Sequence, residues 1–488
     1  MIESKEKLPR ILLAAGASGS GKTLITCGLL QALKNRGLKI ASFKCGPDYI
    51  DPMFHSRVIG AKSRNLDTFF TSGKRTRYLL GKDAADCDIA VMEGVMGFYD
   101  GVGGTTVRAS AYDLAKETDT PVIFIVNSKG MSVSLAAYIK GFLEYKKDSR
   151  IRGVIFNQMS PMLYPRMKRL VEEEAGVRVL GYVPKVEDCV IESRHLGLVL
   201  PDEIPELQNR LRVLAGILEE TLDLEGILTL AQEAEELEIP TDLADEEEAF
   251  RYQVGSEDEA CEVLSSRTSE KRTVRIGVAS DEAFCFFYED NFRLLREMGA
   301  ELVFFSPIHD STLPEKLDGL LLCGGYPELN GKALEDNERL RKEIAFAISQ
   351  GMPCMAECGG FMYLHEEMED MDGRFYRMAG VIPGRAFRTP KLTRFGYITL
   401  EQKEPVLGDN ELGPVPAHEF HYFDSESCGE SFHAFKPQSS RGWDCIHGSD
   451  RLLLGFPHLY YYANPRIPRA FLRKCLEYRR EQGAGNDI

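Results

Sequence analysis

The sequence predicts an α/β protein with two doubly wound parallel-sheet domains, and three observations lead to this prediction. Short apolar runs alternate with longer amphipathic segments in both halves of the chain. A glycine-rich loop at 16–23 follows the first apolar run, and an acidic stretch separates the two halves. Strands that are apolar throughout, separated by amphipathic helices, are typical of parallel sheets covered on both faces.

Length and composition limit the classes of function. A chain of 488 residues is too long for one hydrophobic core, so we expect more than one domain. The formal net charge of −16 argues against nucleic acid or an anionic membrane surface as general partners. We find no export signal and no apolar run of membrane-spanning length, and therefore expect a cytoplasmic protein. Its 12 cysteines include no CxxC pair, so we expect reduced thiols and no cysteine-bound metal.

The first half of the chain predicts a domain that spans 8–218. Its first strand leads through the glycine-rich loop into an amphipathic helix at 23–37. Further strands are predicted where β-branched and other apolar residues form short continuous runs. The predicted strands are 10–16, 38–44, 87–94, 121–128 and 152–159.

The acidic stretch at 219–272 contains few strand-forming residues, so we expect it to form a helix and a linker. Charge runs of this kind usually lie on solvated surface. After it the alternation of strand and helix resumes, which predicts a second parallel-sheet domain at 273–479. The predicted strands of this domain are 274–280, 301–307, 317–325 and 352–360.

The loop "GASGSGKT" fits the phosphate-binding pattern G-x-x-x-x-G-K-[ST] and stands between a strand and a helix. Glycines allow backbone N–H groups to face phosphates, and the helix N-terminus adds positive potential. Lys22 is expected to reach the outer phosphates, and the Thr23 hydroxyl to bind Mg²⁺. The predicted nucleotide-binding residues are Gly16, Gly19, Ser20, Gly21, Lys22 and Thr23.

A nucleotide site also needs carboxylates for the metal ion. Glu93 ends a predicted strand at the sheet edge from which an acid can reach Mg²⁺ beside the loop. Asp48 and Asp51 follow another strand, and Asp100 lies in a glycine-rich turn. Asp-Pro and Gly-Pro pairs also form structural turns, so a purely structural role remains an alternative, as it does for Lys44.

The stretch "AECGGFMYL" predicts a strand, a sharp turn at Cys358 and then a helix. This geometry exposes a side chain, aims the following N–H groups at an oxyanion, and places the thiol at a helix N-terminus that lowers its pKa. Gly359, and Gly325 in the upstream "CGGYPEL", are candidate oxyanion donors. A small buried hydrophobic side chain is the alternative for Cys358.

A thiol nucleophile requires a base, and three histidines of the second half are candidates. His458 lies in "FPHLYYYANP", while His418 and His421 lie in "AHEFHY". The residues themselves leave this choice open.

Taken in order, these motifs are similar to those of the cobyrinate a,c-diamide synthase family, glutamine-dependent amidases of corrinoid biosynthesis. The resemblance covers nearly the whole chain, and the ordered set is far more specific than any one motif. It is carried by "GASGSGKT", "FKCGPDYIDPMFH", "SRNLDTFF", "MEGVMGFYDG", "ESRHLGLVLP", "DEAFCFFYEDN", "ELVFFSP", "LLCGGYPEL", "AECGGFMYL", "RFGY", "HEFHY" and "HLYYYANP".

The resemblance implies a division of labour between the two domains. The first domain would phosphorylate a carboxylate with ATP and Mg²⁺, and the second, resembling class I glutaminases, would release ammonia from L-glutamine. It also implies cobyrinic acid or a related tetrapyrrole as substrate, and leaves a homodimer open. The implied roles are nucleophile for Cys358, base for His458, metal binding for Thr23, Asp48 and Glu93, and substrate or acyl-phosphate contact for Tyr49, Asp51 and Asp100.

Three alternatives remain at this point. The same motifs would serve amidation of nickel-sirohydrochlorin or hydrogenobyrinate, whereas they fit cobyric acid synthases less well. A P-loop regulatory ATPase with an inactive amidotransferase-like tail would be expected to lack Cys358 or His458, and both are present.

Many class I glutaminases carry a glutamate two residues after the histidine, but Tyr460 stands there, so a Cys-His dyad is expected.

Overall fold

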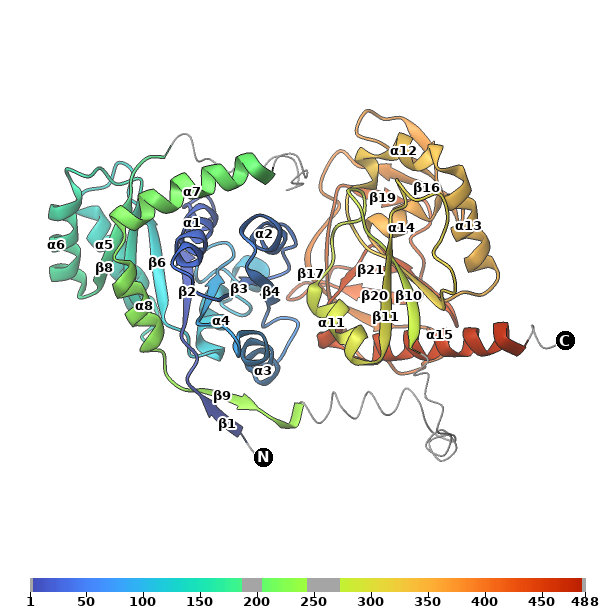
Figure 1. Cartoon of the computed structure of the whole chain (residues 1–488), viewed down its shortest axis with the longest axis horizontal. Helices are drawn as coiled ribbons and strands as arrows, with labels where there is room; N and C mark the ends of the chain where they lie inside the picture. The colour runs from blue at the N-terminus through green and yellow to red at the C-terminus, as the bar shows by residue number, and fades with distance from the viewer. Residues whose placement is uncertain (1–2, 187–203, 244–272, 485–488) are drawn as a thin grey trace. The chain divides into compact units, whose positions relative to one another are not determined.

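A computed structural model describes residues 3–186, 204–243 and 273–484, and the chain divides into two compact units, Met1–Leu243 and Ala244–Ile488 (Figure 1). Each unit contains a mainly parallel sheet flanked by helices, which confirms the predicted α/β class. Within the described ranges, no helix is long and apolar enough to cross a membrane. The motif "ESRHLGLVLP" and the acidic segment 244–272 lie outside the described residues.

The first unit is built on a seven-stranded sheet of order β4-β3-β5-β2-β6-β7-β8, in which every pairing is parallel. Strand β2, which leads into the phosphate loop, lies in the middle of the sheet and is buried along its whole length. The strands are β2 Arg10–Ala15, β3 Ile40–Cys45, β4 Lys62–Leu66, β5 Ile89–Glu93, β6 Val122–Asn127, β7 Ile151–Asn157 and β8 Arg178–Val183.

Helices connect these parallel strands. The chain runs from β2 through β3 to β4 at one edge of the sheet, and then back through β5 and β6 to β8 at the other edge. Because connections between parallel strands are right-handed, α1 and α2 lie on one face of the sheet and α3 to α6 on the other. The helices are α1 Lys22–Asn35, α2 Ile50–Phe54, α3 Gly73–Ala84, α4 Ala111–Glu117, α5 Ser134–Tyr145, α6 Tyr164–Ala175, α7 Ile204–Thr221 and α8 Leu224–Gln232.

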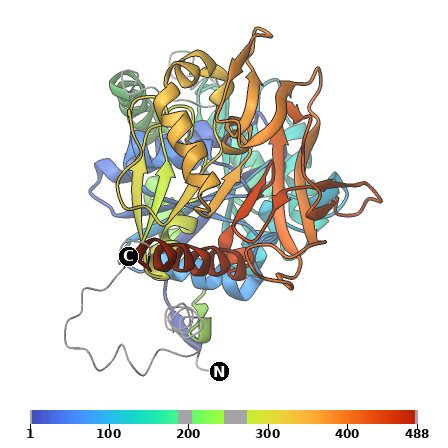
Figure 2. The same cartoon turned by 90° about the vertical axis from the view of Figure 1, so that its right-hand side faces the viewer.

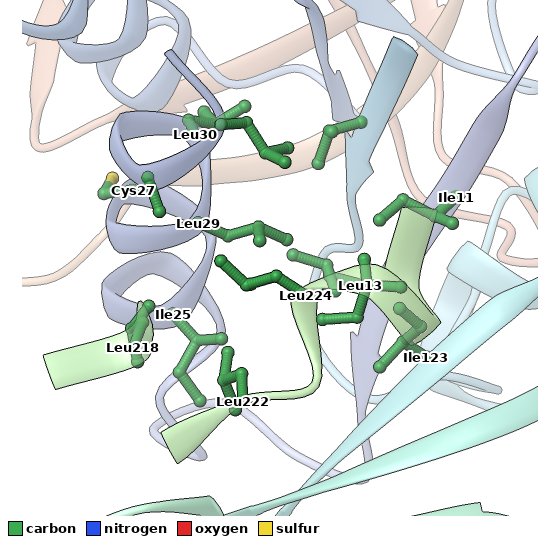
Figure 3. Close-up of a cluster of buried hydrophobic side chains, with 14 of the residues drawn as sticks. Ile11, Leu13, Ile25, Cys27, Leu29, Leu30, Ile123, Leu218, Leu222 and Leu224 are labelled. Carbon is green, nitrogen blue, oxygen red and sulfur yellow. The ribbon is translucent and has the colours of Figure 1, made fainter. Parts of the chain in front are cut away.

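The core of the first unit holds the phosphate-loop helix in place (Figure 3). Leu207, Leu211, Leu214 and Leu218 repeat at helical spacing and give α7 one apolar face, which packs on α1. A Cβ atom on Gly28 of α1 would lie 2.6 Å from Leu218 and 2.8 Å from Leu214. The two helices therefore approach so closely that a side chain at position 28 would separate them.

The segment 219–240 differs from the expected acidic linker. Leu222, Leu224 and Ile227 are buried in the core of the first unit, and strand β9 (Leu237–Pro240) pairs with β1 (Glu3–Glu6). The acidic residues mark the exposed face of this segment, while its leucines and isoleucines determine that it packs. The first unit therefore extends beyond the expected boundary at 218.

The second unit contains a six-stranded sheet of order β11-β10-β12-β13-β23-β22, parallel except for the β22-β23 pair. Helix α15, drawn in red in Figure 2, packs against this sheet: Phe471 and Cys475 approach Gly319 of β12. The elements are β10 Val274–Ala279, β11 Ala300–Phe305, β12 Gly319–Leu322, β13 Cys354–Glu357, β22 His447–Gly448, β23 Leu452–Gly455, α11 Glu289–Glu297, α12 Gly331–Asp336, α13 Glu338–Ser349, α14 Gly359–Tyr363 and α15 Arg466–Ala484.

Two further sheets are formed by strands that lie between β13 and β23 in the chain, together with β24 after them, where only a continued parallel sheet was expected. Their strands alternate buried and exposed residues and pair mostly antiparallel, as strands with one solvated face do. The strands are β14 His365–Glu369, β15 Phe375–Arg377, β16 Ile382–Arg388 and β19 Phe423–Ser425 in one sheet, and β17 Arg394–Gln402, β18 Val415–His421, β20 Phe432–Phe435, β21 Gly442–Cys445 and β24 His458–Leu459 in the other.

We expect Leu214→Ala to lower the free energy of unfolding of the first unit by about 2–5 kcal/mol, because it leaves a cavity between α7 and α1. Val213→Ala is the matched control on the same helix, since Val213 is 52% exposed. It should change stability by less than about 0.5 kcal/mol. Urea unfolding of both variants tests the packing, and equal effects would contradict it.

Candidate active sites

The phosphate loop joins β2 to α1 through a backbone that few residues other than glycine adopt. Gly19 and Gly21 have φ of 76° and 93°, and a Cβ atom on Gly21 would lie 2.2 Å from the amide nitrogen of Asn157. That buried amide donates a hydrogen bond of 2.9 Å to the Ser20 carbonyl. The loop is thus fixed from the end of β7 as well as by α1.

Lys22 and Thr23 occupy the first two positions of α1 and point to different partners. The Lys22 ammonium donates to the carbonyl oxygens of Met96 at 2.6 Å and Ala17 at 3.2 Å. The Thr23 hydroxyl donates to Glu93 Oε1 at 2.7 Å. The structure therefore brings the predicted metal-binding threonine and glutamate into direct contact, while the lysine rests on neutral backbone groups.

A buried cluster of opposite charges stands at the carboxyl ends of β3 and β5. Lys44, only 4% exposed, donates to Glu93 Oε1 at 2.8 Å and forms a short ion pair with Asp51. Its distance to Asp48 Oδ2 is 3.9 Å. The carboxylates of Asp48, Asp51 and Glu93 converge on this ammonium, so Lys44, for which a structural role remained an alternative, lies at the centre of the site.

The electrostatics of this cluster follow from burial and pairing. Burial raises the pKa of Glu93 to about 7, against the opposing effect of Lys44. Burial also opposes ionisation of Lys44 and Asp51, yet the carboxylates raise the pKa of Lys44 well above its ordinary value and Lys44 lowers the pKa of Asp51. The net effect is a charged lysine held between carboxylates.

Asp100 and Tyr49 lie at two other positions of this site. The Gly97 N–H donates to Asp100 Oδ2 at 3.1 Å, and a Cβ atom on Gly97 would lie 2.8 Å from the Gly16 carbonyl. Asp100 is therefore positioned beside the start of the phosphate loop. Tyr49 precedes α2, next to Asp48, and its hydroxyl oxygen is buried.

The donor set of this site is suited to Mg²⁺, which prefers oxygen ligands and keeps several waters and phosphate oxygens. The Thr23 hydroxyl and the Glu93 carboxylate are in contact, and Asp48 is held nearby through Lys44. In the part of the chain that the structure describes, no three acidic, histidine or cysteine side chains form a complete metal-binding group.

In the second unit, Cys358 stands on a sharp turn between β13 and α14, with φ 45° and ψ −103°. A Cβ atom on Gly360 would lie 2.2 Å from the Leu322 carbonyl, so the turn admits no side chain there. A Cβ atom on Gly359 would lie 3.0 Å from the Gly325 nitrogen. The two glycine turns expected to supply oxyanion donors are therefore adjacent, beside the thiol.

The Cys358 thiol differs from expectation in its pKa. Burial raises this pKa, and the charges of Glu328 and Glu419 raise it further, while the Gly359 N–H lowers it only in part. The expected lowering of the thiol pKa at the helix N-terminus is therefore outweighed by burial and by the neighbouring carboxylates, since the side chain is only 7% exposed. Ionisation of this thiol requires a nearby proton acceptor.

His458 is the histidine that the fold brings to the cysteine turn. It lies on β24, and a Cβ atom on Gly324 would lie 2.5 Å from its Cε1 atom. Its Nδ1 atom is 3.6 Å from Glu357 Oε2, the residue before Cys358. The ring of His418, its partner across the β18-β24 pair, stacks on it at a centroid distance of 5.2 Å.

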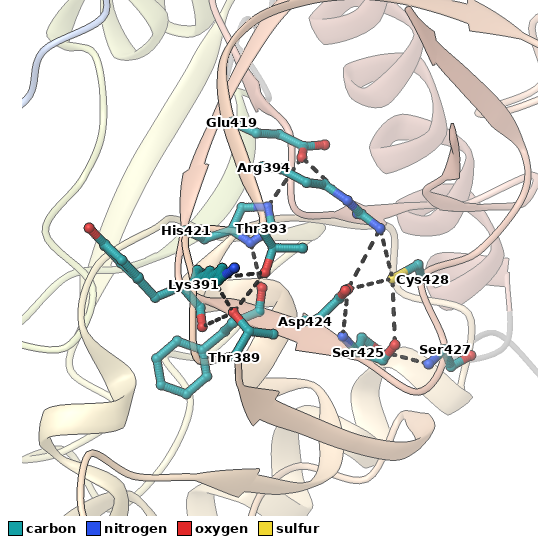
Figure 4. Close-up of polar contacts among 12 residues, drawn as sticks. Thr389, Lys391, Thr393, Arg394, Glu419, His421, Asp424, Ser425, Ser427 and Cys428 are labelled. Carbon is teal, nitrogen blue, oxygen red and sulfur yellow. Dashed lines mark hydrogen bonds and ion pairs between the residues drawn. The ribbon is translucent and has the colours of Figure 1, made fainter. Parts of the chain in front are cut away.

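The other two candidate bases are less well placed. His421 donates from Nδ1 to the Phe423 carbonyl at 2.6 Å and lies 3.2 Å from Glu419, within the network shown in Figure 4. Arg394 lies between Glu419 and Asp424 in the same network, at 3.9 and 3.6 Å. The motifs "RFGY" and "HEFHY" thus form a buried charge network that ties β17, β18 and β19 together.

Burial, and then the neighbouring His458, lowers the pKa of His418 well below its ordinary value. It contacts His458 by ring stacking. Because His458 lies 3.6 Å from Glu357, the residue before Cys358, it stays the predicted base.

Sequence reasoning missed two functional candidates. Asn157 lies within a predicted strand, but no motif distinguishes an asparagine that supports a phosphate loop 137 positions earlier. Glu357 lies within the stretch that identified Cys358, yet its proximity to His458 depends on strand pairings between distant segments. The one sequence feature that could have suggested Glu357 is its position directly before the candidate nucleophile Cys358.

Two family models match the chain. A CobQ/CobB/MinD/ParA nucleotide binding domain matches residues 11–198, and a CobB/CobQ-like glutamine amidotransferase domain matches residues 275–446. The first match contains the phosphate loop with its carboxylates, and the second contains Cys358.

Curated proteins named cobyrinate a,c-diamide synthase match nearly end to end. The one from Thermoplasma volcanium is 36% identical over 478 residues, covering 98% of this chain and 99% of that protein. The one from Caldanaerobacter subterraneus subsp. tengcongensis is 35% identical over 480 residues, covering 97% and 100%. The one from Listeria innocua is 36% identical over 464 residues, covering 94% and 97%.

His365, directly after the α14 turn, makes the second unit sensitive to acid. Its Nδ1–H donates to the Phe361 carbonyl at 2.9 Å, Ser425 Oγ is 2.6 Å from Nε2, and burial lowers its pKa to about 4. The unfolded chain, with a histidine pKa of about 6.5, binds a proton first as pH falls. Stability is therefore lost between about pH 6.5 and pH 4, by about 2 kcal/mol from pH 7 to pH 5.

Urea unfolding at pH 7 and pH 5 measures this loss. His365→Gln should be less stable at pH 7 but lose less stability on acidification than the wild type. His309→Gln is the matched control because His309 is on the surface, with a side chain 62% exposed, and should behave as wild type. An unchanged acid loss in His365→Gln would contradict the assignment.

Proposed function

The chain belongs to the cobyrinate a,c-diamide synthase family, and from this premise we propose that it amidates the a and c acetate carboxylates of cobyrinic acid. ATP activates each carboxylate and L-glutamine supplies the nitrogen, as a step of cobalamin biosynthesis. The enzyme is a glutamine-dependent carbon–nitrogen ligase. The observation that carries the proposal is that one chain holds a phosphate loop with its carboxylates and a cysteine on a strand-to-helix turn, with His458 within 3.6 Å of the residue before that cysteine.

Activation of the carboxylate takes place in the first unit. A carboxylate does not react with ammonia near neutral pH, so it must first gain a leaving group. One carboxylate oxygen of the substrate attacks the γ-phosphorus of ATP, ADP leaves, and an acyl phosphate forms. Ammonia then adds to the acyl carbon and phosphate leaves, which yields the amide.

The residues of the first unit have separate tasks in this scheme. Glycine N–H groups of the loop and Lys22 bind the phosphates of ATP. Lys44, held between carboxylates, neutralises negative charge where two anions must meet. The resemblance implies that Tyr49, Asp51 and Asp100 would contact the acetate groups or the acyl phosphate; Asp51 pairs with Lys44, and Asp100 accepts from the Gly97 N–H.

Thr23, Glu93 and Asp48 would hold Mg²⁺, which supplies charge neutralisation at the phosphates when bound. The contact between Thr23 and Glu93 keeps two oxygen ligands together before nucleotide arrives.

Release of ammonia takes place in the second unit. The Cys358 sulfur attacks the side-chain amide carbon of glutamine while its proton passes to His458. N–H groups of Gly325 and Gly359 would stabilise the oxyanion. The proton then goes to the leaving nitrogen, ammonia departs, and water hydrolyses the thioester to glutamate.

The substrate assignment is tested by mass spectrometry of the product. Purified protein is incubated with cobyrinic acid, ATP, Mg²⁺ and glutamine, with nickel-sirohydrochlorin and hydrogenobyrinic acid in parallel tubes. We expect two amide additions to cobyrinic acid, with one ATP cleaved for each. Preference for another tetrapyrrole would keep the reaction and change the pathway, whereas no product from any of the three would contradict the proposed function.

The two-site scheme predicts opposite behaviour for two variants. Cys358→Ala should abolish amidation with glutamine but retain it with a high concentration of ammonium, because the activation site is intact. Lys22→Ala should stop amidation with either nitrogen source, since no acyl phosphate forms. Amide yield with each source is the measurement, and equal loss of both activities in Cys358→Ala would refute the scheme.

A further inference from the structure

A Cys-His pair reacts efficiently when a third group fixes the imidazole in the correct tautomer and stabilises its charged form. In this chain the position two residues after His458 carries Tyr460, which has no acidic group to offer. Its ring packs edge-on against Tyr288 at 5.1 Å and lies 6.0 Å from the ring of Tyr462. That position contributes to aromatic packing, so a carboxylate for His458 must come from elsewhere in the fold.

Glu357 is placed to provide that carboxylate. Its Oε2 atom lies 3.6 Å from His458 Nδ1, and the side chains of Glu357 and His458 are 9% and 3% exposed. The second carboxylate oxygen, Oε1, is buried and has no hydrogen-bond partner among the described residues. A buried carboxylate is costly unless a cation or a donor lies beside it, and the imidazole is the group beside its Oε2 atom.

The backbone of the second unit holds this pair in register. Glu357, the last residue of β13, is paired with Gly455 of β23, and the Cys358 N–H donates to the Gly455 carbonyl at 2.9 Å. His458 lies three residues after Gly455, and its backbone pairs with that of His418 on β18. Two parallel strands therefore bring the acid, the nucleophile and the base to one edge of the sheet.

From this geometry we propose that Glu357 is the positioning residue of the glutamine site and completes a Cys358-His458-Glu357 triad in which the acid directly precedes the nucleophile. The inference rests on the proposed function and deepens it. The Glu357 carboxylate attracts the Nδ1–H of His458, which leaves Nε2 to accept the Cys358 proton. When the imidazolium forms, the carboxylate neutralises it within a site that water does not enter freely.

The distance of 3.6 Å in the free protein is longer than a hydrogen bond. Catalytic contacts are often long before substrate binds and shorten in the complex. A shortening of less than one ångström would bring the two atoms within hydrogen-bond reach. The other titratable groups that surround Cys358, Glu357 and His458 are Cys323, Glu328, His418, Glu419 and Tyr461.

The test compares Glu357→Gln with the wild type in glutamine-dependent amidation. We expect kcat to fall about ten- to a hundredfold, less than the roughly 10⁴-fold loss in a serine protease whose triad acid is replaced by its amide, because a thiol is intrinsically more nucleophilic. KM for glutamine should stay unchanged, since Glu357 contacts His458 and not the substrate. The limb of the pH–rate profile that reports His458 should move to lower pH, because the imidazolium loses its anionic neighbour.

Two further variants keep the test decisive. Glu357→Asp retains the charge on a shorter side chain and should recover part of kcat and the wild-type pH limb. Glu367→Gln, the same substitution at a partly exposed position on β14, should leave all three quantities unchanged. If Glu357→Gln does not fold, Glu357→Asp alone carries the test, and a pH limb displaced in that variant overturns the triad.

The outcomes separate this inference from the proposed function. Ammonium-dependent amidation should be unaffected in every Glu357 variant. Wild-type kcat in Glu357→Gln, a change in KM alone, or equal loss with glutamine and ammonium would each overturn the triad. If Glu357→Gln shows wild-type kcat or a change in KM alone, the proposed function still stands, provided that Cys358→Ala loses only the glutamine-dependent activity. The proposed function falls if Cys358→Ala retains the glutamine-dependent activity.

Discussion

At the carboxyl ends of β2 and β13 the chain turns from a strand into a helix in a space that excludes a Cβ atom. Gly21 would place one 2.2 Å from the Asn157 amide, and Gly360 would place one 2.2 Å from the Leu322 carbonyl. Both chemistries depend on this steric constraint. It brings backbone N–H groups to the phosphates in the first unit, and in the second it holds the Cys358 backbone at a φ of 45°, so that the thiol projects from the turn.

The first unit also depends on the pairing of buried charges. An ammonium removed from water is stable only beside anions, and Lys44 has three carboxylates within reach. Those carboxylates would otherwise repel the phosphates of ATP, so the lysine makes the site less negative. Lys22, in contrast, rests on two neutral carbonyls, which phosphate oxygens can replace with stronger charge-assisted hydrogen bonds.

The sequence was most informative where local pattern and chemistry coincide. Continuous apolar runs predicted the parallel sheets, the loop pattern located Lys22 and Thr23, and the glycines after Cys358 predicted its turn. The antiparallel sheets from β14 to β21 were missed because their alternating exposure is weak evidence beside stronger motifs. The proximity of Glu357 to His458 could not be predicted, since it arises from pairings between strands about 100 residues apart.

The thiol shows why local reasoning about pKa fails in a packed site. A helix N-terminus stabilises a thiolate, but one short helical turn is outweighed by removal of the sulfur from water and by nearby carboxylates. A thiol whose pKa is raised forms little thiolate by itself, so its reaction depends on a base such as His458, and therefore on whatever orients His458. In a site that raises the pKa of its nucleophile, the position of the base matters more than the intrinsic reactivity of the sulfur.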